Sequence, residues 1–275
     1  MRGLKGKTAI VTGSGIGRAI ALRLASEGVT VGVFDINPAG AAETVKAIAA
    51  ADGKSVAVSC DITDYAGVTK AVAEFEAAIG EGTEILVNNA GWDTPMPFLK
   101  TDEAFWKKVV AINYMGPLHM THAVGQGMNA RKSGRIINIA SDAGRVGSSG
   151  EVVYSGCKGA TIAFGKALAR EVARSQITVN TVCPARPTRR RWMPLSAAAR
   201  PARRSATRWC AACRSGASAC PTTTPVSSRF SPATTRLSSP ARRSASRAVF
   251  RRAITQYLTG NILAPIVHSL TRSER

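Results

Sequence analysis

The sequence predicts an α/β protein whose first 184 residues form a doubly wound parallel sheet. Six short segments rich in β-branched residues alternate with longer segments of helical periodicity, which is the order of strands joined by helices. These strands are apolar along almost their whole length, as expected when helices cover both faces of a sheet. The six expected strands are residues 8–13, 30–35, 55–61, 84–91, 134–141 and 177–184.

The helix between the third and fourth expected strands has recognisable ends. Thr63 or Asp64 can cap its first turn, and Gly80 with Gly82 can end it after Ile79. Ligands of doubly wound sheets bind beside the carboxyl ends of the strands. The polar residues that directly follow each strand are therefore the candidates for a functional site.

Charge divides the chain into two parts. The protein has 37 Lys and Arg residues against 17 Asp and Glu, a net charge of +20. Residues 185–275 hold 18 of the 37 basic residues, all of them Arg, and only one acid, Glu274. We therefore expect one folded domain over residues 1–184 and an Arg/Ser/Pro-rich tail over 185–275, whose composition is typical of disorder.

The cysteines and apolar segments predict a cytoplasmic protein without a metal. No secretory signal follows Met1, and no apolar segment approaches the roughly 18 residues of a membrane helix. Cys210 and Cys213 form a CxxC pair, but zinc needs two further ligands, and His268 is far along the chain. We expect reduced thiols and no metal site.

A glycine-rich turn, TGSGIGRAIA at residues 12–21, follows the first strand. Glycines allow the backbone to turn tightly and to approach a pyrophosphate, whose charge then meets the N-terminus of the next helix. Such a turn is weak evidence alone, and its place between a strand and a helix strengthens it. The candidate phosphate-binding residues are Gly13, Ser14, Gly15, Ile16 and Gly17.

Asp35 ends the second expected strand. A carboxylate at this place can accept both hydroxyl groups of an adenosine ribose and would repel a 2′-phosphate, which favours NAD over NADP. The alternative is an aspartate that only opens a turn before Asn37 and Pro38.

Three polar residues after the fifth strand suggest acid/base chemistry. Tyr154 and Lys158 are four residues apart, so a helix would place them on one face. An ammonium beside a tyrosine lowers the pKa of the phenol, so the pair can act as one acid/base unit. Ser141 could hydrogen-bond and polarise a reacting carbonyl oxygen. Taken alone, the Tyr–Lys spacing is also typical of a solvated helix face.

Together these residues resemble the short-chain dehydrogenase/reductase family over residues 1–184. The resemblance implies a Rossmann-type fold, a nicotinamide cofactor and reversible hydride transfer between an alcohol and a ketone. Asp35 makes NAD the expected cofactor. The motifs that carry the resemblance are the glycine loop at 12–17, NNAG at 88–91, Asn113, Ser141, Tyr154 and Lys158.

The resemblance also implies a role for each site residue. Tyr154 would be the general acid/base, Lys158 would lower its pKa and hold the nicotinamide ribose, and Ser141 would orient the substrate oxygen. Asn113 would support a water that relays protons toward Lys158. The residues expected beside the cofactor are Asp61 and Ile62 at the adenine, Asn89, Ala90 and Gly91 along the central sheet, and Pro184 after the sixth strand.

Within the family, the likeness is closer to 2-hydroxycyclohexanecarboxyl-CoA dehydrogenases. It rests on NNAGWD at 88–93, GPLHMTHAV at 116–124 and IASDAGRVGSSGE at 139–151. A reductase of 3-oxoacyl thioesters is the alternative, and both possibilities imply an acyl-CoA or similar thioester substrate. The resemblance further implies a homotetramer.

The glycine loop departs from the family pattern. The family has three residues between its first two glycines, whereas only Ser14 separates Gly13 from Gly15 here. A loop shortened by two residues leaves fewer backbone N–H groups for a pyrophosphate, so we expect weaker cofactor binding.

The second departure begins after Pro184, where the family continues with Pro-Gly and then a substrate loop, two helices and a seventh strand. Residues 184–189 can be encoded by the codons CCG GCC CGA CCG ACA CGG, and one G restored after the first of them changes the translation to PGPTDT, the family's continuation. Residues 215–249 likewise allow codons whose neighbouring frame resembles the family's C-terminus. We expect that the tail is out of frame, that the sheet is incomplete at its C-terminal end and that activity is impaired.

Two other classes of function remain open for the tail. Arg clusters near Trp192 and Trp209 could bind nucleic acid through phosphate contacts and base stacking. The chain could also be an inactive product, because loss of the seventh strand exposes a sheet edge. An out-of-frame tail carries no selected charge, so we expect no specific nucleic-acid partner and no membrane partner.

Overall fold

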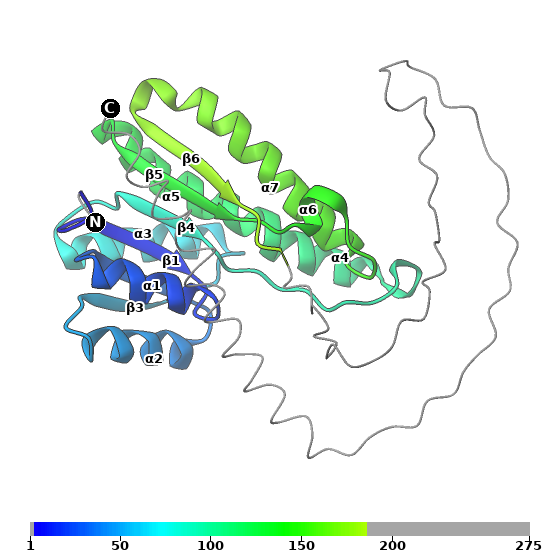
Figure 1. Cartoon of the computed structure of the whole chain (residues 1–275), viewed down its shortest axis with the longest axis horizontal. Helices are drawn as coiled ribbons and strands as arrows, with labels where there is room; N and C mark the ends of the chain where they lie inside the picture. The colour runs from blue at the N-terminus through cyan, green and yellow to red at the C-terminus, as the bar shows by residue number, and fades with distance from the viewer. Residues whose placement is uncertain (1–2, 186–275) are drawn as a thin grey trace, which may run out of the picture. The chain divides into compact units, whose positions relative to one another are not determined.

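A computed structural model describes residues 3–185 of the chain. The tail beyond Ala185, with its Arg clusters and its CxxC pair, lies outside the described residues. The described part contains one six-stranded parallel sheet of order β3-β2-β1-β4-β5-β6. Figure 1 shows the sheet and its labelled helices. The strands are β1 (Thr8–Thr12), β2 (Thr30–Asp35), β3 (Ser55–Ser59), β4 (Ile85–Asn88), β5 (Gly134–Ile139) and β6 (Ile177–Val182).

This strand order confirms the α/β fold with a doubly wound parallel sheet. The chain moves outward from β1 to β3, returns to the centre and then moves outward again from β4 to β6. The carboxyl ends of β1 and β4 therefore flank the point where the direction of winding reverses, which is where such sheets bind ligands. All six expected strands are present.

Helices connect the strands and cover both faces of the sheet. Asp64 caps α3 by accepting the N–H of Ala66 at 3.1 Å, and Gly80 ends it in the left-handed conformation with φ of 71°. The helices are α1 (Gly17–Ser26), α2 (Pro38–Ala49), α3 (Tyr65–Ile79), α4 (Glu103–Val110), α5 (Gly116–Arg131), α6 (Ala143–Val146) and α7 (Val152–Glu171). Short η turns lie at η1 (Phe98–Lys100), η2 (Ala111–Met115) and η3 (Ala173–Ser175).

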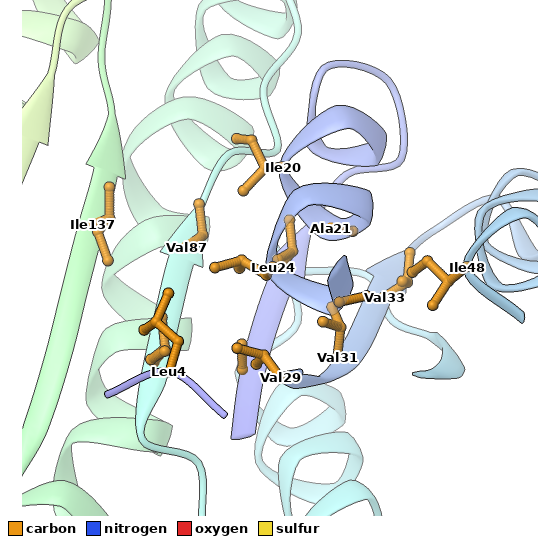
Figure 2. Close-up of a cluster of buried hydrophobic side chains, with 14 of the residues drawn as sticks. Leu4, Ile20, Ala21, Leu24, Val29, Val31, Val33, Ile48, Val87 and Ile137 are labelled. Atoms are coloured by element: carbon orange, nitrogen blue, oxygen red, sulfur yellow. The ribbon is translucent and has the colours of Figure 1, made fainter. Parts of the chain in front are cut away.

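Alternation along each strand produces two apolar clusters, one on each face. One cluster joins the sheet to α1 and α2, with Leu24 and Ile48 packed over Val31, Val33 and neighbouring strand residues (Figure 2). The other joins the opposite face to α3 and α5, and Leu168 of α7 and Val172 just after this helix pack against it. The central strands are therefore buried from both faces, which explains their near-continuous apolar sequences.

The β6 strand is an edge of the sheet within residues 3–185, because β5 is its neighbour on one side only. Five of its six residues, Thr178 to Val182, are only partly buried. On the α7 face, Gly165 allows the helix to approach, since a Cβ there would lie 2.7 Å from Thr181 Oγ1. Among the helices of residues 3–185, none has the length and apolar character needed to cross a bilayer.

Candidate active site

A cavity of about 860 Å³ opens at the carboxyl ends of β1, β2 and β4. Its size lies within the usual range for cofactor pockets. The cavity brings together glycine-loop residues, Asp35, Asp61 and the segment after β4, whereas the predicted catalytic residues are not among the residues that line it. These residues are Asn113, Ser141, Tyr154 and Lys158. The lining of the cavity includes Gly13, Ser14, Gly15, Ile16, Asp35, Asp61, Ile62, Asn89, Ala90 and Gly91, together with Trp92, Lys107 and Lys108.

The glycine loop is joined by hydrogen bonds to the segment that follows β4. The Thr12 hydroxyl accepts the backbone N–H groups of Asn89 and Ala90, each at 3.0 Å. Asn89 Nδ2 in turn donates to the carbonyls of Thr12 and Gly13 at 2.9 and 3.2 Å. A Cβ at Gly17 would lie 2.8 Å from Asn89 Nδ2, so only glycine permits this approach. The loop is therefore held against the centre of the sheet.

The same loop is also tied to the end of β2. Gly13 has a φ of 78°, and its N–H donates to the carbonyl of Phe34 at 2.7 Å. The next N–H, that of Ser14, donates to Asp35 Oδ2 at 2.5 Å. Two of the four amides between β1 and α1 are thus used within the protein. This finding agrees with the expectation that a shortened loop offers fewer donors to a pyrophosphate.

Asp35 opens a turn, as one of its two interpretations proposed. Its Oδ1 atom accepts the N–H of Asn37 at 2.8 Å, and Asn37 then caps α2 through the N–H of Ala39 at 3.1 Å. The carboxylate still lines the cavity, so this turn and a ribose-binding role do not exclude each other. Asp61 also opens a turn, because its Oδ1 accepts both the N–H and the hydroxyl of Thr63 at 2.9 and 2.8 Å.

Lys158 is a buried cation on α7, with only 4% of its surface exposed. Its Nζ donates to the carbonyl of Ile139, the last residue of β5, at 3.0 Å. It lies 5.5 Å from the centre of the Tyr154 ring, one helical turn earlier. Burial lowers the pKa of Lys158 from its usual 10.5 to about 8. With this pKa, the Lys158 side chain is still mostly protonated at pH 7, so it can act as an ammonium.

Asn113 lies near Lys158, on a π-helical turn between α4 and α5. Its Nδ2 donates to the carbonyls of Trp92 and Val109 at 2.6 and 2.9 Å, and its Oδ1 accepts the N–H of Trp92 at 3.3 Å. A Cβ at Gly91 would lie 2.9 Å from Asn113 Oδ1 and 3.5 Å from Lys158 Nζ. Gly91 is therefore the point where Asn113 and Lys158 meet. Single π-turns inside helices are frequent at functional sites.

Ser141 and Pro184 lie at the ends of neighbouring strands. Ser141 follows β5, is partly buried, and accepts the N–H of Ala143 through its hydroxyl at 3.2 Å. The carbonyl of Pro184, just after β6, accepts the N–H of Asp142 at 3.1 Å. A Cβ at Gly144 would lie 2.6 Å from the backbone carbon of Lys158, so the Ser141 loop packs directly on α7. The loop that carries Ser141 is thus adjacent to the helix that carries Tyr154.

Comparison with known proteins decides the family, because a short chain dehydrogenase family model matches residues 7–189. The chain belongs to the short-chain dehydrogenase family. It is therefore an oxidoreductase of a family that uses nicotinamide cofactors. An acetoacetyl-CoA reductase of Rhizobium meliloti (strain 1021) is 39% identical over 180 residues, which are 65% of this chain and 73% of that protein.

Further relatives support the same family assignment. The 3-oxoacyl-[acyl-carrier-protein] reductase FabG of Escherichia coli (strain K12) is 36% identical over 182 residues, or 66% of this chain and 73% of that protein. Among solved structures, NAD⁺-bound xylitol dehydrogenase superposes with a TM-score of 0.65 at 32% identity, covering 67% of this chain and 72% of that one. The shared architecture confirms the Rossmann-type fold.

Sequence reasoning missed Trp92 and Lys108 in this short-chain dehydrogenase. The Lys108 ammonium lies 4.1 Å from the centre of the Trp92 ring, and both side chains line the cavity. Trp92 directly follows the NNAG segment, and this position was the available signal. Nothing in the spacing from Trp92 to Lys108 indicates their contact, because it depends on how α4 packs.

The cysteines within residues 3–185 are free thiols rather than ligands. Burial raises the pKa of Cys60 to about 11 and also raises the pKa of Cys157 and Cys183. Because these shifts keep the three thiols protonated, we expect them to be unreactive at neutral pH. In the same residues, no group of three or more His, Cys, Asp or Glu side chains is arranged to hold a metal ion.

Proposed function

We propose that this protein is built to interconvert 3-oxoacyl and 3-hydroxyacyl thioesters with NAD(H). The observation that carries the proposal is that buried Lys158 and Asn113 both lie beside Gly91, and that Gly91 itself lines the large cavity. Tyr154 lies one helical turn from Lys158, so a proton donor, an ammonium and a cofactor-sized cavity occupy one edge of the sheet. This combination suits hydride transfer coupled to proton transfer.

Each catalytic side chain has a role that its surroundings support. Tyr154 gives a proton to the carbonyl oxygen or takes it from the alcohol. Lys158 favours the phenolate by its charge, and its bond to the Ile139 carbonyl fixes where that charge lies. Ser141 hydrogen-bonds the substrate oxygen. Asn113 holds the segment after β4 in position through Trp92. We further propose that it supports a water that relays protons toward Lys158.

The residues around the cavity fit a dinucleotide. A Cβ at Gly15 would meet nothing within 4 Å, so the loop backbone is open to the cavity there, where a pyrophosphate would approach, and the buried Ile62 offers an apolar wall for adenine. Asp35 would repel a 2′-phosphate, and the relation to an NAD⁺-bound xylitol dehydrogenase also supports NAD. When bound, the nicotinamide supplies or accepts the hydride.

The relatives favour the second of the two substrates that the sequence suggested. Acetoacetyl-CoA reductases and a 3-oxoacyl-[acyl-carrier-protein] reductase are 36–39% identical to the chain, and their names describe 3-oxoacyl thioesters. The expected 2-hydroxycyclohexanecarboxyl-CoA shares the β-hydroxy thioester but carries a ring. We therefore propose a linear 3-oxoacyl-CoA or acyl-carrier-protein substrate, a cytoplasmic location and assembly as a homotetramer.

We also propose that the chain consists of a catalytic part, residues 1–184, and an out-of-frame tail, residues 185–275. The family match ends at residue 189, close to the point where acidic residues almost vanish from the sequence. The charge of the tail then reflects its reading frame rather than a binding function. We expect the unchanged chain, with its out-of-frame tail, to have weak reductase activity.

Two proteins test the proposal. One is the unchanged chain, and the other is produced from a gene in which one G is restored after the codon of Pro184. Oxidation of NADH by acetoacetyl-CoA is followed by absorbance, with Tyr154→Phe in the restored protein as the control. We expect the restored protein to be active and Tyr154→Phe to lower its rate by about 100- to 10,000-fold. A restored protein that reduces no 3-oxoacyl thioester would contradict the substrate assignment. Equal activity of the two proteins would contradict the frame proposal.

A further inference from the structure

Ser14 hydrogen-bonds the Asp35 carboxylate, which is the group that the adenosine ribose of a dinucleotide would bind. Its backbone N–H and its hydroxyl both donate to Asp35 Oδ2, each at 2.5 Å. The other oxygen, Oδ1, accepts the N–H of Asn37 at 2.8 Å. A carboxylate has about four acceptor positions, and three are therefore filled from within the protein.

A ribose diol needs two acceptor positions on such a carboxylate when both hydroxyls bind. The three internal bonds leave about one. Ser14 and Asp35 both line the cavity, so the serine lies on the side from which a nucleotide would approach. The Asp35 turn to Asn37 lies at the start of α2, where Asn37 serves as the cap. The bond that can be exchanged is that of the Ser14 hydroxyl.

The shortened loop explains why Ser14 reaches Asp35. Ser14 directly follows Gly13, and the Gly13 N–H bonds the Phe34 carbonyl. This bond holds Ser14 beside the end of β2. The hydroxyl also lies over the first turn of α2, because a Cβ added at Gly40 would come within 2.6 Å of Ser14 Oγ. Ser14 is thus held between Asp35 and Gly40.

We propose that Ser14 is an internal ligand of Asp35 that competes with the adenosine ribose of the cofactor and so limits nucleotide affinity. The proposal rests on the dinucleotide site of the proposed function and adds a residue that restrains it. Nucleotide entry requires the Ser14 hydroxyl to rotate away from the carboxylate. Variants that remove or displace this hydroxyl should bind the nucleotide more tightly.

Two variants of the full chain test this from different sides. Ser14→Ala removes the hydroxyl, and Gly40→Ala pushes it off Asp35 with a new methyl group while adding helix propensity to α2. Ser26→Ala is the matched control, since the Ser26 hydroxyl bonds only the nearby Arg23 carbonyl on an exposed surface. The probe is ADP-ribose, titrated by calorimetry, so that hydride transfer is not needed for the readout.

We expect Ser14→Ala and Gly40→Ala each to bind ADP-ribose about fivefold more tightly than the unchanged chain, which corresponds to one hydrogen bond. Ser26→Ala should bind like the unchanged chain. With 2′,3′-dideoxyadenosine diphosphate, which lacks both hydroxyls, the gain should disappear.

Unchanged or weaker ADP-ribose binding by Ser14→Ala would overturn the proposal, because the hydroxyl would then be neutral or a ribose contact. That outcome leaves the proposed function standing. If neither the unchanged chain nor any variant binds ADP-ribose, the dinucleotide site itself is wrong and both proposals fall. Should Gly40→Ala not fold, Ser14→Ala alone decides between these results.

Discussion

Replacing Lys158 by methionine should stabilise the protein at neutral pH while destroying its catalysis. The Lys158 ammonium is almost fully buried, and burial lowers its pKa from 10.5 to about 8. The charged form is therefore less favourable in the folded state than in the unfolded chain. Methionine keeps a similar unbranched stem without the charge, so the cost of burying that charge is removed.

The magnitude follows from the pKa difference. A shift from 10.5 to about 8 corresponds to roughly 3 kcal/mol of folding free energy at 1.36 kcal/mol per unit. The variant loses the bond from Lys158 to the Ile139 carbonyl, worth about 1 kcal/mol. A net gain of roughly 2 kcal/mol remains at pH 7, or about 4–8 °C in the unfolding midpoint of a domain of this size.

The gain should depend on pH in a defined direction. Between pH 8 and 10.5 the unfolded chain binds the proton that folded Lys158 has released, so the unchanged protein becomes more stable as pH rises. The advantage of Lys158→Met is therefore full below pH 8 and lost by about pH 10.5. Urea unfolding at pH 7 and pH 10, without nucleotide, measures this difference.

Lys166→Met is the matched control, because Lys166 lies on the same helix and is exposed. Its effect should stay within about 0.5 kcal/mol at both pH values. If Lys158→Met is less stable than the unchanged protein at pH 7, or if its advantage is the same at pH 10, the reasoning about this buried charge is refuted.

Glycines at close contacts provide the remaining predictions. Gly91→Ala places a methyl group 2.9 Å from Asn113 Oδ1, so turnover of the frame-restored enzyme should fall about a hundredfold, measured by NADH oxidation. Gly165→Ala should lower the free energy of unfolding by about 1–3 kcal/mol, because its Cβ would lie 2.7 Å from Thr181 Oγ1. Gly156→Ala on the same helix meets nothing within 4 Å and should raise stability by up to about 1 kcal/mol, so equal effects at the two positions would contradict the contact argument.

The fold could be predicted from the sequence because it depends on periodicity that local segments carry. All six strands and the caps of α3 were expected, and Asp64 rather than Thr63 is the cap. The expected strands ran one to three residues too long at the carboxyl ends of five of the six. Those residues, such as Asn89 and Ser141, leave the ladder to reach the site, and their composition does not reveal where pairing stops.

The site was less predictable where it depends on packing between distant segments. The spacing of Tyr154 and Lys158 is a property of one helix and could be predicted, whereas the π-turn that carries Asn113 depends on how α4 joins α5. The bonds from Ser14 to Asp35 could not be foreseen either. The sequence indicated a short loop, but only the packing of β1 beside β2 determines which group that loop contacts.

The hydroxyl of Thr12 links two segments that are 77 residues apart in the chain. It satisfies the amides of both Asn89 and Ala90 and donates to the carbonyl of Val87 at 3.4 Å. Valine has the same shape but no oxygen, so it would leave both amide donors without this acceptor. Serine keeps the hydroxyl, so it is the replacement that can retain all three hydrogen bonds of Thr12 and the link between the two segments.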